Sequence, residues 1–144
     1  MEDGNLENVV IKRQIAVELG ESWGIMIIRS EQFDAMVIPN IADFIERAIA
    51  FLYENFPESL DEDADELTET VGLLIEQAEK YGLETEQQVM TYITTAWLLG
   101  VNFDEEFPAA NETLNSKDFT PDEKADWLAK WTEDIFAAFE EEEK

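Results

Sequence analysis

The sequence contains no cysteine and no histidine. These absences exclude disulfide bonds, thiolate and imidazole ligation of metals, cysteine nucleophiles and histidine acid–base catalysis. Zinc would have to be held by carboxylates alone, which match its preferred ligands poorly. We therefore expect a protein that is not an enzyme and that has no cofactor and no tightly bound metal.

Glycine is also scarce, with six scattered residues and no phosphate-binding loop, dinucleotide fingerprint or nucleophile elbow. Acidic residues are abundant, and two carboxylates can carry out glycoside hydrolysis. However, 35 acids in 144 residues form pairs by chance, so the presence of pairs does not indicate that chemistry. The sequence predicts no catalytic residue.

Basic residues are few: nine Lys and Arg stand against 35 Asp and Glu, which gives a formal net charge of -26. A field of this sign repels nucleic acids and anionic membranes. Apolar runs such as Ile25–Ile28 are far shorter than the roughly 20 residues that span a bilayer. The first residues lack the basic and apolar regions of a signal peptide. We expect a cytoplasmic protein that binds neither nucleic acid nor membrane.

The chain nevertheless has enough apolar residues for a core, because 45% of it is hydrophobic and 11% aromatic. Apolar residues recur at steps of three and four around Phe44, Leu74 and Trp131, as they do on the buried face of a helix. The pattern predicts a mainly α fold, a compact bundle of four to five main helices. We expect helices at Glu31–Val37 after Ser30, from Asn40 to Pro57, around Leu67–Ala78, from Thr85 to Gly100 and from Thr120 to Phe139. One or two further helical turns are expected over Pro108–Leu114.

Three of these helix ends carry clear signals. Thr85 followed by Gln88 is a capping box, and so is Thr120 followed by Glu123. Gly82 can adopt the positive φ that ends a helix. The helix after Thr85 is apolar on most of its surface, so we expect it at the centre of the fold.

The N-terminal residues do not follow the helical pattern. Val9–Val17 and Trp23–Arg29 are rich in β-branched and aromatic residues and are separated by Gly20. They predict a short β-hairpin, with a helix as the alternative for the first stretch. We divide the chain into an N-terminal extension (1–25), a single helical domain (26–139) and an acidic tail (140–144) that frays.

Asp61, Asp63 and Asp65 stand at the first, third and fifth positions of a calcium-loop pattern. The pattern then fails, because Glu66 occupies the glycine position and Gly72 the position of the closing glutamate. We interpret this stretch as a solvated acidic connector whose charge favours the positive N-terminal end of the next helix.

No Lys or Arg lies between Arg47 and Lys80, or between Lys80 and Lys117. The acidic residues in these stretches form either a solvated surface or a negatively charged face that attracts a basic partner. Trp131 is expected in the core, whereas Trp127 fits a core position and a partner contact about equally. The candidate partner-binding residues are Asp61, Glu62, Asp63, Asp65, Glu66, Asp104, Glu105, Glu106 and Trp127.

Three stretches of the sequence are similar to a known family: IIRSEQFDAM (Ile27–Met36), FIERAIAFLYENFPE (Phe44–Glu58) and IEQAEKYGLETEQQVMTYITTAWLLGVNFDEEFP (Ile75–Pro108). They resemble small acidic helical proteins encoded beside effectors of the bacterial type VI secretion system. The resemblance implies an accessory role, as an immunity protein that neutralises a co-encoded toxin or as an adaptor that helps to load it. It brings no catalytic residues.

The chain departs from that family at two places. Proteins of the family begin near the equivalent of Met26, so Met1–Ile25 has no counterpart. Phe107 and Pro108 stand where the family tends to have a tryptophan.

Two functions therefore compete. One is a cytoplasmic binding protein for an antibacterial effector, which needs apolar anchors inside an acidic rim. The alternative is a decoy that imitates a nucleic-acid backbone and occupies the basic groove of a nucleic-acid-binding protein. The decoy needs acids spaced like phosphates, and the sequence does not fix their spacing in three dimensions.

Overall fold

Long helices form most of the computed structural model, which describes residues 33–142 of the chain. The predicted mainly α fold of four to five main helices is confirmed, and no β-strand occurs in this part of the chain. The elements are α3 (Ile41–Asn55), the 3-10 helix η1 (Pro57–Asp61), α4 (Ala64–Lys80), α5 (Glu86–Leu99), α6 (Phe103–Glu106), α7 (Pro108–Asn115) and α8 (Pro121–Glu142).

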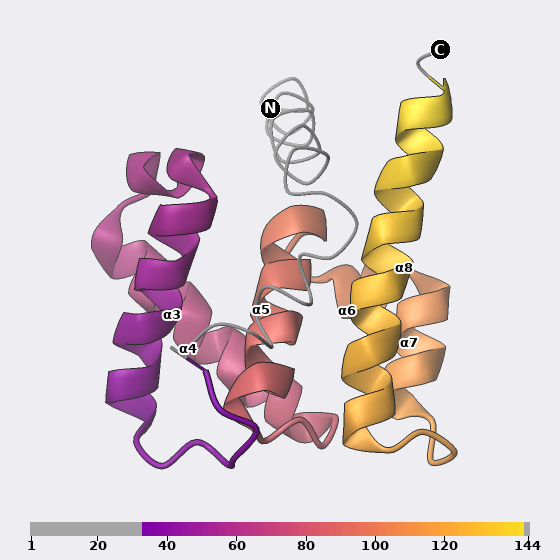
Figure 1. Cartoon of the computed structure of the whole chain (residues 1–144), viewed down its shortest axis with the longest axis horizontal. Helices are drawn as coiled ribbons and strands as arrows, with labels where there is room; N and C mark the ends of the chain where they lie inside the picture. Colours follow the sequence, from indigo (N-terminus) through magenta and orange to yellow (C-terminus); the bar gives the residue numbers. More distant parts are fainter. Residues whose placement is uncertain (1–32, 143–144) are drawn as a thin grey trace.

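Helix α5 lies at the centre, with α3 and α4 on one side and α7 and α8 on the other (Figure 1). Every residue from Gln88 to Ala96 is buried, including polar ones. Thr94 and Thr95 bury their hydroxyls at little cost, because each donates a hydrogen bond of 2.9 Å to a carbonyl one turn earlier. The predicted central helix is therefore confirmed.

Helix α3 begins at Asn40, whose side chain accepts a 3.0 Å hydrogen bond from the backbone N–H of Asp43. Its apolar residues recur on one face, and Phe44 and Ala48 are fully buried there. In α4, Leu67, Val71, Leu74, Ile75 and Ala78 are buried as the sequence predicts.

The predicted helix ends are also confirmed. Thr85 and Gln88 form both hydrogen bonds of a capping box at the start of α5. Thr120 and Glu123 form the same pair of bonds at the start of α8, at 2.9 and 3.1 Å. Gly82 has a φ of +87°, a conformation that costs a residue with a Cβ atom about 1–2 kcal/mol.

The predicted helix over Glu31–Val37 is wrong for the residues that the structure describes. Residues 33–38 contain no helix and instead run beside the start of α5. The N–H of Ile38 donates to the carbonyl of Glu84 at 3.2 Å, and the N–H of Glu86 donates to the carbonyl of Met36 at 3.0 Å. These long-range bonds give the backbone groups of Met36 and Ile38 partners outside the segment, so the segment does not need a local helix to satisfy them.

The other end of the chain also differs from the sequence interpretation. Helix α8 continues past Phe139 to Glu142, into the segment that we expected to fray. The N-terminal extension and its β-hairpin lie outside the described residues. Over residues 33–142, none of the helices combines the length and apolar character required to cross a membrane.

Candidate partner-binding surface

A groove of about 190 Å³ opens between α4 and α5, and we call it the α4/α5 groove. Its walls are largely apolar because the inward faces of α4 and α5 meet there, and Leu52 of α3 also lines it. Exposed carboxylates of Glu62 and Glu66 lie at its edge. The complete lining is Leu52, Glu62, Glu66, Leu67, Thr70, Val71, Leu74, Ile93, Ala96, Trp97, Gly100 and Val101.

The acidic residues beside the groove belong to an ordered segment. The connector expected from the sequence is the helix η1 followed by the first turn of α4. Asp63 is the N-cap of α4, and its Oδ1 accepts hydrogen bonds from the N–H groups of Asp65 and Glu66 at 2.9 and 3.1 Å. Asp61, Glu62, Asp63, Asp65 and Glu66 are all exposed. The structure therefore brings these five predicted residues together at one end of α4.

Trp97 forms part of the groove wall and was not among the residues predicted to bind a partner. Its indole Nε1–H donates to Oε1 of Glu58 at 3.1 Å, and its ring lies 6.5 Å from that of Phe56. The sequence places Trp97 on an apolar helix, which indicates burial but does not show that one side of the ring faces a groove.

The three acidic residues of α6 differ in burial, because one is buried and two are exposed. Asp104 is only 6% exposed, and its Oδ2 accepts a 2.6 Å hydrogen bond from the Tyr81 hydroxyl. Burial, followed by this hydrogen bond, raises the pKa of Tyr81 above its ordinary value. Glu105 and Glu106 are exposed, and neither lines the α4/α5 groove. Asp104 thus stabilises the interior, while its two neighbours contribute to the surface charge.

Trp127 is half-buried on α8. Its ring stacks on that of Trp131, with centroids 5.0 Å apart and an interplanar angle of 17°. Trp131 is also half-buried and packs edge-on against Phe107 at 5.3 Å. Both tryptophans therefore pack against the core, and neither lines the α4/α5 groove.

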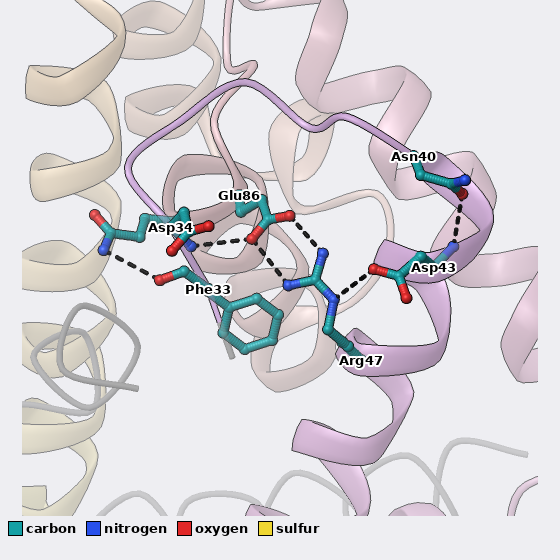
Figure 2. Close-up of polar contacts among 7 residues, drawn as sticks. Phe33, Asp34, Asn40, Asp43, Arg47 and Glu86 are labelled. Carbon is teal, nitrogen blue, oxygen red and sulfur yellow. Dashed lines mark hydrogen bonds and ion pairs between the residues drawn. The ribbon is translucent and has the colours of Figure 1, made fainter. Parts of the chain in front are cut away.

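The most buried ion pair described in residues 33–142 joins Arg47 of α3 to Glu86 of α5 (Figure 2). The guanidinium makes two hydrogen bonds to the carboxylate, and its Nε–H donates to Asp43 at 2.9 Å. The N–H of Asp34 also donates to Glu86, at 3.0 Å. The hydrogen bond from Arg47 is the main reason that the pKa of Glu86 lies below its ordinary value.

This arrangement is suited to holding elements together rather than to acid–base chemistry. Both oxygens of Glu86 accept hydrogen bonds, and its side chain is only 2% exposed. The segment that it anchors also packs through Phe33, whose ring lies 5.8 Å from Phe44 and 5.4 Å from Phe51. Arg47 and Glu86 therefore fix residues 33–40 against α3 and α5.

Comparison of this chain with protein-family models, curated proteins and solved structures finds no match. Within the described ranges, no three acidic side chains converge in a way that could hold a metal ion. The α4/α5 groove combines an apolar hollow with the exposed acidic side chains of Glu62 and Glu66. A second hollow of about 190 Å³, lined by Val37, Ile38, Ile41, Ile75, Glu79, Leu83, Glu84 and Val89, has the same combination with Glu79 and Glu84.

Proposed function

We propose that this chain is a non-catalytic protein-binding module that recognises a basic partner protein through the α4/α5 groove and its acidic edge. The observation that carries the proposal is an apolar hollow directly beside exposed carboxylates. Specific protein interfaces have this composition, with an apolar centre and a polar rim.

The two parts of the surface have different roles in binding. The charge of -26 attracts a cationic protein over distances of about a Debye length, roughly 8 Å at physiological ionic strength. This attraction raises the rate of encounter. Contacts in the groove act only at short range, so they slow dissociation of the complex. The acids thus set how fast the partner arrives, and the apolar lining sets how long it stays.

The resemblance to proteins encoded beside type VI secretion effectors supports an antibacterial effector as that partner. The longest similar stretch, Ile75–Pro108, includes the whole of α5 and so the groove residues Ile93, Ala96 and Trp97. An immunity protein and an adaptor both require a stoichiometric complex with one effector in the cytoplasm. The proposal covers both roles.

An acidic decoy that imitates nucleic acid is the competing function. A decoy presents carboxylates in place of phosphates and gains little from an apolar hollow beside them. The α4/α5 groove therefore favours a protein partner that offers apolar as well as basic side chains.

The proposal is tested by recovering the partner and measuring its rates of binding. We expect tagged protein in host lysate at low salt to retain a basic protein encoded by a neighbouring gene, in a one-to-one complex. Wild type and Glu62→Gln/Glu66→Gln are then compared with Glu69→Gln/Glu76→Gln, which removes two exposed charges of α4 that do not line the groove. Purified neighbour-encoded proteins that do not bind at any salt concentration would overturn the proposal.

A further inference from the structure

The geometry points to a particular ligand for the α4/α5 groove: a lysine- or arginine-rich segment that inserts one large apolar side chain into the hollow. The inference rests on the proposed function and adds the chemistry of the segment and the place where it binds. Glu62 and Glu66 would meet the cationic groups, while Trp97 and Val101 would contact the apolar side chain, over a floor that includes the buried Val71 and Ile93.

The size of the hollow supports a single side chain. Its volume is about 190 Å³. An apolar cavity of about 150 Å³ accommodates a benzene molecule in another protein, so this hollow holds one leucine, methionine or phenylalanine side chain. Most of its lining is aliphatic or aromatic, which favours such a group over a polar one.

The charge around the hollow supports basic neighbours for that side chain. Glu62 and Glu66 are exposed, and neither has an ion-pair partner among the described residues. A second copy of this chain is a poor occupant, because two molecules of charge -26 repel one another. A cationic segment relieves this repulsion as it binds.

Two synthetic peptides separate the apolar contact from general electrostatic attraction. One contains lysines and alanines with a single central leucine, and the other has alanine at that position and is otherwise identical. We expect the leucine peptide to bind about tenfold more tightly, a difference of about 1.4 kcal/mol. We also expect it to shift the Nε1–H resonance of Trp97 in a ¹H–¹⁵N spectrum. Equal affinities, or an unshifted Trp97 resonance, would overturn the inference.

A pair of variants locates the contact. Thr70→Trp fills the hollow from α4, whereas Leu73→Trp adds the same side chain to α4 at an exposed position that does not line the groove. The first should abolish the preference for the leucine peptide, and the second should retain it. If Thr70→Trp does not fold, Val101→Trp fills the hollow from the loop after α5, where Val101 is 44% exposed. A leucine preference that survives a folded, filled groove would contradict the inference.

The partner recovered from the host distinguishes this inference from the proposed function. If the leucine and alanine peptides bind equally but the filled-groove variant still weakens binding of the partner, the inference is wrong and the proposed function stands. Equal binding of the partner to wild type and to a folded filled-groove variant would contradict both. If no basic protein binds wild type at all, the proposed function fails, whatever the peptides do.

Discussion

The guanidinium of Arg47 and the carboxylate of Glu86 join two helices through residues 39 positions apart in the sequence. The carboxylate is almost completely buried, and the guanidinium is 29% exposed. The same carboxylate also accepts a hydrogen bond from the N–H of Asp34. Glu86 therefore joins α5 both to α3 and to the segment that precedes α3. This relationship makes a clear prediction about stability.

Arg47→Ala should lower the free energy of unfolding by about 3 kcal/mol, because it leaves the Glu86 carboxylate buried without its cation. Asp43→Ala removes the exposed partner of the same guanidinium and should cost less than about 1 kcal/mol. Urea unfolding followed by circular dichroism measures both. Similar losses for the two variants would show that the buried pair contributes no more than a surface pair.

The pair also predicts a dependence on pH. The pKa of Glu86 is lower in the folded state than its ordinary value of 4.5. Its stabilising effect is therefore complete above about pH 4.5 and is lost as the pH falls through the folded-state pKa. Glu86→Gln does not titrate, so the difference in unfolding free energy between wild type and this variant should shrink below about pH 4.5.

The difference between the two proteins is the quantity to measure, because acid also relieves repulsion among the many other carboxylates. That relief is common to both proteins and cancels. A difference that stays constant from pH 7 to pH 3 would contradict the assignment of Glu86 as an ionised, hydrogen-bonded group.

Asp104 and Glu105 are neighbours on α6 that should respond differently to mutation. Asp104→Ala leaves the Tyr81 hydroxyl without its acceptor and should destabilise the protein by about 2 kcal/mol. Glu105→Ala alters an exposed residue and should change stability by less than about 0.5 kcal/mol. Thermal unfolding distinguishes them, and equal shifts in Tm would contradict the internal role of Asp104.

The sequence predicts the helices well because their signals are local. The apolar spacing around Phe44 and Leu74 and the capping boxes at Thr85 and Thr120 each involve residues only a few positions apart. Such signals determine which face of a helix is buried and where the helix begins. The same reasoning places the acids of 61–66 together, because they are adjacent in the chain.

Features that depend on distant residues are not visible in the sequence. Asp34 lies 52 positions from Glu86, and their hydrogen bond helps to hold a non-helical segment in place of the expected helix. The sequence alone groups Asp104 with the exposed acids, because nothing near it in the chain shows that the Tyr81 hydroxyl donates a hydrogen bond to it. The α4/α5 groove arises only when two helices pack, so Trp97 could be predicted as apolar but not as part of a groove wall.

The most direct test of the proposed function is the association rate of the recovered basic partner at low salt, measured by stopped-flow fluorescence. We predict that Glu62→Gln/Glu66→Gln slows association several-fold more than Glu69→Gln/Glu76→Gln does, and that added salt removes the difference. Dissociation should change much less. Equal association rates for the two double variants would contradict a binding site at the acidic edge of the α4/α5 groove.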